Sequence, residues 1–131
     1  MPTVKVNDIS LYYEIHGKGE PLVLVMGLGT DISEWKTIID PLSKKYKVLV
    51  FDNRGAGRSD KPDEPYTIKL MASDAAGVIK AAGFEPANVL GISMGGAIAL
   101  ELTLNDPDLI KKLILVSTAA RFIKRQRTSW L

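Results

Sequence analysis

The sequence predicts an α/β fold: a mostly parallel sheet with an antiparallel amino-terminal hairpin and helices on both faces, forming a three-layer sandwich. Apolar runs at residues 21–26, 47–51, 89–90 and 112–116 are continuous, as in strands that are buried on both faces. Between these runs, apolar residues recur at helical spacing. This alternation is typical of βαβ units, whose right-handed crossovers lay strands parallel with helices on either side.

The composition is that of an ordinary soluble domain. The chain has 131 residues, of which 46% are hydrophobic and 24% charged, and this length suits one domain. A net charge of +2 gives no indication of nucleic-acid binding, and no apolar run approaches the roughly 20 residues of a membrane span. The amino terminus lacks a signal-peptide pattern, so a cytoplasmic location is expected. Because there is no cysteine, disulfides, thiolate zinc sites and a cysteine nucleophile are excluded.

The first elements are a hairpin and a buried strand. Apolar and polar residues alternate on both sides of Asn7-Asp8, which predicts a β-hairpin. A glycine-containing loop then leads into the apolar run 21–26. In the helical pattern that follows, Ser33 is a possible cap, and Pro41 is predicted to kink the helix or end it early.

The next elements are a strand at 47–51, a glycine-rich loop at 52–60 and a helix. Thr67 is predicted to cap this helix and Gly83 to end it. The last strand is predicted at 112–116.

The joint between the strand at 89–90 and the helix after it reads Gly-x-Ser-x-Gly at residues 91–95. A residue on so sharp a strand-to-helix turn needs small neighbours, because strand and helix nearly touch there. This geometry lifts the hydroxyl of Ser93 to the positive end of a helix, where backbone N–H groups stabilise an oxyanion. Ser93 is therefore the candidate nucleophile. The alternative is a tight turn in which Ser93 merely caps the helix.

In parallel sheets the chemistry lies beyond the carboxyl ends of the strands. Three loops qualify, and they carry the residues 26–29, the residues 52–59 and the elbow at 91–96. In these motifs and their order the chain resembles the α/β-hydrolase family, in particular its serine esterase, lactonase and perhydrolase branch. The resemblance implies that the backbone N–H groups of Leu28 and Met94 form an oxyanion hole.

The chain departs from the family pattern in two ways. Met26 stands where histidine is commoner, and that histidine usually braces the loop. The family triad also runs Ser, then Asp or Glu, then His. The only histidine here is His16, at the amino end of a strand that spans roughly 20 Å, so we expect it to lie too far from Ser93. Asp31, Glu34 and Asp52 are expected to serve as loop braces and caps.

The catalytic histidine and acid are thus expected to be missing, as in the amino-terminal half of a serine hydrolase. Residues 1–118 are predicted to be the amino-terminal part of the core, and 119–131 the start of a truncated lid or connecting segment. The segment 119–131 is basic and amphipathic, so an alternative is that it lies on a membrane or an acidic partner.

The predicted function is hydrolysis of small carboxylic esters or lactones through an acyl-enzyme on Ser93, and the isolated chain is expected to be weakly active or inactive. The alternative is a non-catalytic scaffold that assembles through an exposed edge at 113–116, with a second copy or a complementing carboxyl-terminal half. Nucleotide binding is disfavoured, because Ile32 stands where the third glycine of a dinucleotide fingerprint belongs. We expect no cofactor, no metal, and no nucleic-acid or membrane partner.

Overall fold

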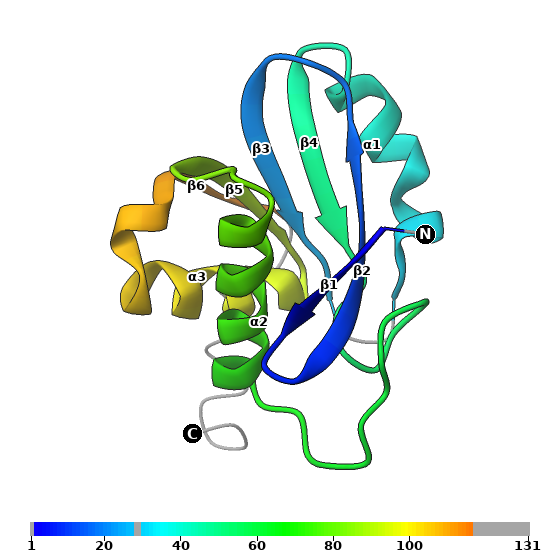
Figure 1. Cartoon of the computed structure of the whole chain (residues 1–131). Helices are drawn as coiled ribbons and strands as arrows, with labels where there is room; N and C mark the ends of the chain where they lie inside the picture. Colours follow the sequence, from blue (N-terminus) through cyan, green and yellow to red (C-terminus); the bar gives the residue numbers. More distant parts are fainter. Residues whose placement is uncertain (1, 28–29, 117–131) are drawn as a thin grey trace.

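The computed structural model describes residues 2–27 and 30–116, which form a six-stranded sheet flanked by helices (Figure 1). The strands are β1 (Thr3–Val6), β2 (Ile9–His16), β3 (Glu20–Val25), β4 (Tyr46–Phe51), β5 (Ala87–Ile92) and β6 (Ile110–Val116). The helices are α1 (Lys36–Leu42), α2 (Ile68–Ala81) and α3 (Met94–Asn105), with short 3-10 helices η1 (Ile32–Trp35) and η2 (Pro107–Leu109).

The strand order is β1-β2-β4-β3-β5-β6. β1 pairs antiparallel with β2 and β2 antiparallel with β4, whereas β4, β3, β5 and β6 are mutually parallel. The predicted fold class, with its amino-terminal hairpin, is therefore confirmed. Because β3 and β5 lie inside the sheet and helices cover both faces, these strands need the continuous apolar sequence that predicted them.

The hairpin turn is built from Asn7 and Asp8, whose φ angles are 49° and 65°. Two positive φ angles give the turn a twist that matches the right-handed twist of the flanking strands. The side chain of Asn7 also donates a hydrogen bond to Asp74 on α2, over 2.8 Å. This contact fixes the hairpin against the helix layer.

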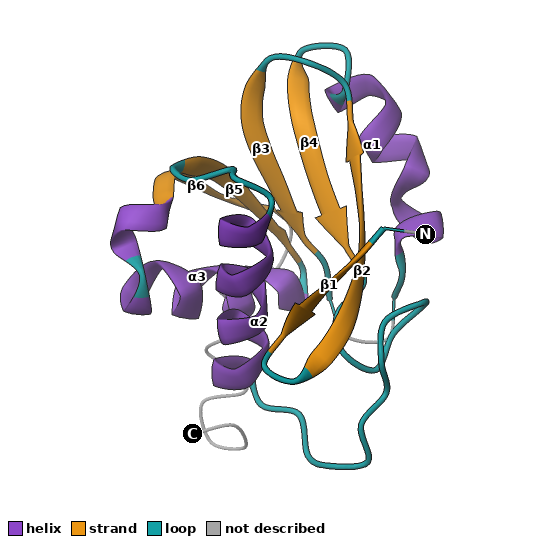
Figure 2. Cartoon of the chain, in the orientation of Figure 1, coloured by secondary structure: helices purple, strands orange, loops and turns teal. Residues whose placement is uncertain are grey.

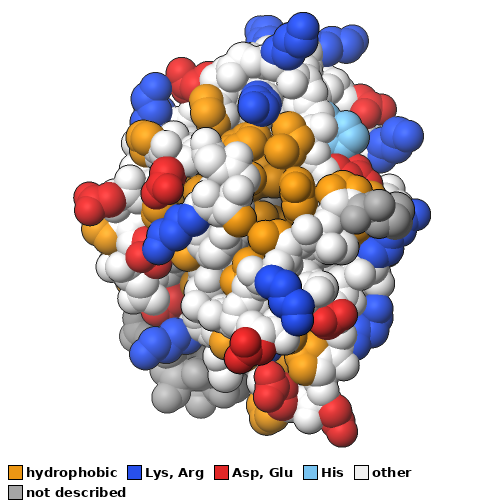
Figure 3. Space-filling model, viewed as in Figure 1, with side chains coloured by type: hydrophobic (Ala, Val, Ile, Leu, Met, Phe, Trp, Pro, Cys, Tyr) orange, Lys and Arg blue, Asp and Glu red, His pale blue; other side chains and the backbone are white. Residues whose placement is uncertain are grey.

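Helices lie on both faces of the sheet (Figure 2). An apolar layer forms on each face. On one face, side chains from the sheet pack against α2 and α3, and this layer includes Val23, Leu49, Val89, Ile79 and Leu102. On the other face, sheet residues pack against η1 and α1 through Leu24, Val50, Ile32 and Ile39. On the face seen in Figure 3, hydrophobic side chains gather over β3 and β4 with charged side chains around them.

The helix ends confirm one predicted cap and correct another. The Thr67 hydroxyl accepts a hydrogen bond from the Leu70 N–H at 3.0 Å and caps α2, as predicted. Ser33 is not the cap of the helical segment before β4. Asp31 caps η1 instead, by accepting from the Ser33 N–H at 3.0 Å, because a carboxylate two residues upstream reaches the first free N–H groups.

The strand β6 is an edge of the sheet among the described residues and pairs with β5 alone. Three apolar side chains at its end are exposed: Ile114 at 45%, Leu115 at 38% and Val116 at 40%. The predicted apolar edge is therefore present.

Residues 119–131, predicted as a lid or connecting segment, lie outside the described residues. None of the helices in the described part of the chain has the length and apolar character that a membrane crossing requires.

Candidate active site

Ser93 lies at the joint between β5 and α3 with φ 56° and ψ −124°. A non-glycine residue with positive φ is held in a sparsely populated and strained conformation, and such residues cluster at functional sites. The residue is exposed, and its side chain makes no capping hydrogen bond to α3. The capping alternative therefore finds no support, and the hydroxyl is presented to solvent at the helix start.

The glycines of the elbow are required by close packing. A Cβ on Gly91 would lie 2.7 Å from the carbonyl oxygen of Gly95, and a Cβ on Gly95 would overlap the carbonyl oxygen of Val25. The first turn of α3 therefore presses both on its own strand β5 and on the end of the neighbouring strand β3. Larger residues would push the helix off the sheet.

The carboxyl end of β3 meets the start of α3, as the predicted oxyanion hole requires. Met94 is the first residue of α3, where N–H groups have no partner within the helix. A Cβ built on Gly27 would lie 3.7 Å from the Met94 nitrogen, so the chain leaving β3 passes beside this N–H group. Leu28, the other predicted donor, lies outside the described residues.

Asp52 is a structural brace for the loops around the site. It is 3% exposed, and its two carboxylate oxygens accept hydrogen bonds from the N–H groups of Ile32 at 2.8 Å and Arg58 at 3.0 Å. A Cβ on Gly57 would overlap the Asp52 carboxylate, so the loop folds tightly round it. Asp52 therefore ties the loop after β4 to η1, which confirms the brace predicted for it.

Asp31 and Glu34 are also engaged with backbone. They form a capping box on η1, in which Glu34 accepts from the Asp31 N–H at 3.1 Å. Both carboxylates thus act as caps, as predicted.

The strand register places His16 far from Ser93. Backbone pairing sets one residue of each neighbouring strand at the level of His16: Val48 on β4, Leu22 on β3 and Asn88 on β5. Ser93 lies five residues beyond Asn88. Three strand spacings of about 4.8 Å and five residue rises of about 3.3 Å separate His16 from Ser93 by roughly 20 Å. His16 therefore cannot act as a base for Ser93, as predicted.

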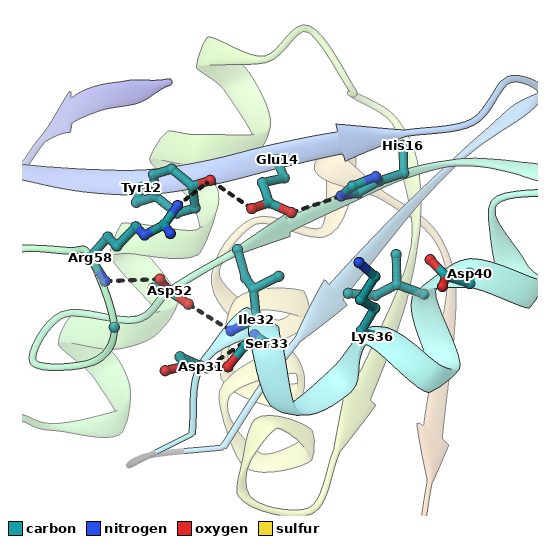
Figure 4. Close-up of a pocket in the computed structure, with 12 residues that line it drawn as sticks. Tyr12, Glu14, His16, Asp31, Ile32, Ser33, Lys36, Asp40, Asp52 and Arg58 are labelled. Carbon is teal, nitrogen blue, oxygen red and sulfur yellow. Dashed lines mark hydrogen bonds and ion pairs between the residues drawn. The ribbon is translucent and has the colours of Figure 1, made fainter. Parts of the chain in front are cut away.

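A cavity of about 320 Å³ opens between β2 and the η1–α1 segment, and Ser93 is not among its lining residues (Figure 4). A polar ladder runs along one side of it: Arg58 Nη1 donates to the Tyr12 hydroxyl at 3.1 Å, and this hydroxyl donates to Glu14 at 2.6 Å. Glu14 also lies 2.8 Å from His16 Nε2. Sequence reasoning did not find this cavity, because its residues come from β2, η1, α1 and the loop after β4.

The ladder groups satisfy one another. Burial raises the pKa of Glu14, but the hydrogen bonds with Tyr12 and His16 outweigh burial and leave this pKa below its ordinary value. The hydrogen bond to Glu14, followed by burial, raises the pKa of Tyr12. At neutral pH the ladder therefore holds a carboxylate and a neutral phenol. Residues 2–27 and 30–116 contain no cluster of three or more histidine or acidic side chains that could hold a metal ion.

Sequence reasoning also missed Asn53, which lies next to Asp52 and is 1% exposed. Its side-chain amide donates a hydrogen bond to the carbonyl oxygen of Met26 at 2.9 Å. The two residues are 27 positions apart, so no local pattern indicates the contact.

Comparison with known proteins points to one family. The sequence model of the alpha/beta hydrolase fold matches residues 20–130. In Azorhizobium caulinodans, a protein named "Putative carbamate hydrolase RutD" is 40% identical over 128 residues, which cover 95% of this chain and 48% of that protein.

Two solved structures agree with this match. Est816, described as an N-acyl homoserine lactone degrading enzyme, superimposes with a TM-score of 0.83 at 34% identity, covering 88% of this chain and 45% of that one. The enol-lactonase from Burkholderia xenovorans LB400 gives a TM-score of 0.80 at 36% identity, covering 86% and 45% respectively. The chain spans about half the length of the curated relatives it matches. From the family match over residues 20–130 and these superpositions, we conclude that the chain belongs to the α/β-hydrolase fold family.

Proposed function

We propose that this chain supplies the nucleophile and the oxyanion hole of a serine hydrolase that acts on small carboxylic esters or lactones. The Ser93 hydroxyl attacks the carbonyl carbon, an acyl-enzyme forms as the alcohol leaves, and water then releases the acid. The N–H groups of Met94 and Leu28 stabilise the oxyanion, each contributing about 3 kcal/mol. The observation that carries the proposal is the exposed Ser93 hydroxyl on a strained elbow, beside the end of β3.

The names of the relatives support the substrate class. They are described as a carbamate hydrolase, an N-acyl homoserine lactone degrading enzyme and an enol-lactonase. Carbamates and lactones both contain a carbonyl carbon bonded to oxygen. We therefore infer a carboxylic acyl group joined to oxygen as the substrate class.

The base and the acid of the reaction come from outside these 131 residues in this proposal. His16 is the only histidine and lies roughly 20 Å from Ser93 by the strand spacings. Without a base, a serine hydroxyl is a poor nucleophile at neutral pH. An oxyanion hole still gives residual catalysis when a triad member is absent, so the chain should react slowly and measurably.

The test is covalent labelling of the purified chain with a fluorophosphonate, read by peptide mass spectrometry. We expect slow labelling of Ser93 that added imidazole accelerates, because imidazole supplies a base that titrates near neutral pH. Ser93→Ala should abolish the labelling, and His16→Gln should leave its rate unchanged. Equal labelling of the Ser93→Ala variant would end the proposal.

The exposed end of β6 favours a second candidate, a scaffold that assembles through this edge with a second copy or a complementing carboxyl-terminal half. Its unpaired backbone groups and the exposed side chains of Ile114, Leu115 and Val116 support pairing with another strand. This candidate predicts assembly without any labelling of Ser93. The division at residue 118 and the cytoplasmic location stay predictions of the sequence.

A further inference from the structure

We propose that Asn53 is a positioning residue for the oxyanion hole. Its side-chain amide holds the end of β3 in place against the first turn of α3, where the Met94 N–H group lies. This inference rests on the proposed function, since it concerns the geometry of that hole.

Asn53 extends the sheet beyond its last backbone pair on this side. The parallel ladder between β3 and β4 ends at the pair Leu24 and Val50. Beyond it, the Asn53 side chain donates to the Met26 carbonyl oxygen at 2.9 Å, with both groups buried. The amide therefore replaces the backbone partner that β4 no longer provides there.

The restrained carbonyl lies next to the site. The carbonyl of Met26 and the nitrogen of Gly27 belong to one planar peptide group, so fixing the oxygen fixes the orientation of that plane. Gly27 in turn passes beside Met94, whose nitrogen would lie 3.7 Å from a Cβ on Gly27.

Asn53 is itself held firmly by its neighbours in the chain. Asp52 binds two backbone N–H groups, as described above. On the other side, the Arg54 guanidinium makes two hydrogen bonds to Asp74, at 2.6 and 2.9 Å. A side chain between two anchored residues loses little conformational freedom when it binds the Met26 carbonyl. Asn53 can therefore hold that carbonyl in one position.

The donor is the part of Asn53 that the structure uses. Its Oδ1 atom is buried and, within the described part of the chain, accepts no hydrogen bond. Burying an unsatisfied acceptor is unfavourable, and an apolar side chain of the same size would avoid that cost. The amide donor to Met26 offsets this cost.

Asn88 offers a matched control. It is also buried, with an Oδ1 atom that lacks a partner among the described residues, and its amide donates to Glu20 and to Pro21. Asn88 lies at the amino end of β5, however, five residues before Ser93. Asn88→Leu therefore removes a similar buried amide without touching the end of β3.

The experiment compares Asn53→Leu with Asn88→Leu in the full 131-residue chain. Amide NMR reports the resonances of Gly27 and Met94, and fluorophosphonate labelling without imidazole reports the reactivity of Ser93. We expect Asn53→Leu to shift both resonances and to slow labelling by about 10- to 100-fold, as small misplacements of catalytic groups do. Asn88→Leu should do neither, although both substitutions lower thermal stability.

Asn53→Asp supplies a pH-dependent rescue. The protonated carboxyl has the shape of the amide and can donate to Met26, whereas the ionised carboxylate cannot. Burial and the neighbouring Asp52 favour the protonated form of the introduced group, and Arg54 opposes this. Relative to the unsubstituted chain at each pH, we expect the labelling rate and both resonances of this variant to recover as the pH falls. A residue that only filled space would show no such recovery.

The outcomes separate this inference from the proposed function. If Ser93 is not labelled in the unsubstituted chain, the proposed function fails, and the NMR comparison still tests the brace. If Ser93 is labelled but Asn53→Leu matches Asn88→Leu in both readouts, the inference is wrong. Should Asn53→Leu fail to fold, Asn53→Asp decides alone. The inference is overturned if the labelling rate of this variant, relative to the unsubstituted chain, stays constant across pH and its Gly27 and Met94 resonances do not move.

Discussion

Ser93 combines exposure with an unfavourable backbone conformation. Its φ of 56° suits glycine, and a serine there costs about 1 to 3 kcal/mol. The surrounding contacts of Gly91 and Gly95 hold strand and helix so close that the joint has little freedom to relax. The backbone strain therefore lies in Ser93, the residue that presents the hydroxyl.

Replacing Ser93 by glycine should stabilise the fold while removing the proposed nucleophile. Relative to Ser93→Ala, which keeps the strained φ, we expect Ser93→Gly to raise the free energy of unfolding by about 1 kcal/mol. The greater freedom of glycine in the unfolded chain offsets part of the gain. Urea denaturation of the two variants measures the difference. Equal stabilities would show that the joint is not strained.

Among the elements, the contact between β3 and α3 sets how closely the chain leaving β3 approaches the N–H group of Met94, a proposed oxyanion donor. Gly95→Ala places a methyl group on the Val25 carbonyl oxygen, with no flexible side chain to move aside. We expect a loss of about 1 to 3 kcal/mol in the free energy of unfolding. Gly27→Ala is the matched control, because its Cβ meets nothing closer than 3.5 Å. The prediction is wrong if both variants unfold at the same denaturant concentration.

A buried ion pair joins the loop after β4 to α2. Arg54 is 2% and Asp74 1% exposed by side chain, and the hydrogen bond to Asp74 raises the pKa of Arg54. Arg54→Met should cost about 3 to 5 kcal/mol, because it leaves the Asp74 carboxylate buried without its cation. Thermal and urea unfolding check this value, and adding Asp74→Leu should restore part of it.

The exposed pair between Lys111 and Glu20 is the control for this measurement. Its side chains are about half exposed, so Lys111→Met should leave the free energy of unfolding nearly unchanged. Equal costs for the buried and exposed pairs would contradict the role given to Arg54.

At the scale of the whole molecule, the β6 edge of the described sheet offers an apolar, exposed strand end to another chain. Lys111 and Lys112, the second and third residues of β6, carry charges that discourage strand pairing, whereas its last three residues are apolar and exposed. We expect concentration-dependent self-association by light scattering, and Leu115→Lys should reduce it. Leu104→Lys is the control, because Leu104 is 78% exposed but belongs to α3, so its backbone cannot pair with another strand. A monomer at every concentration would exclude assembly through β6.

The sequence alone determined the features that short-range rules govern. Strand burial followed from continuous apolar runs, the hairpin from Asn7-Asp8, and the start of α2 from the Thr67 cap. The elbow followed because its glycines and Ser93 are consecutive. Each depends on a few neighbouring residues, so the chain shows it without knowledge of the fold.

Only the tertiary structure decided what lies across the sheet. Three such features join residues far apart in the sequence. They are the strand order, the alignment of His16 on β2 with Asn88 three strands away on β5, and the hydrogen bond from Asn53 to Met26. The cap at Asp31 also prevailed over Ser33 once η1 formed ahead of α1. Hydrogen bonds between strands depend on register and on which strands become neighbours, and no local pattern specifies either.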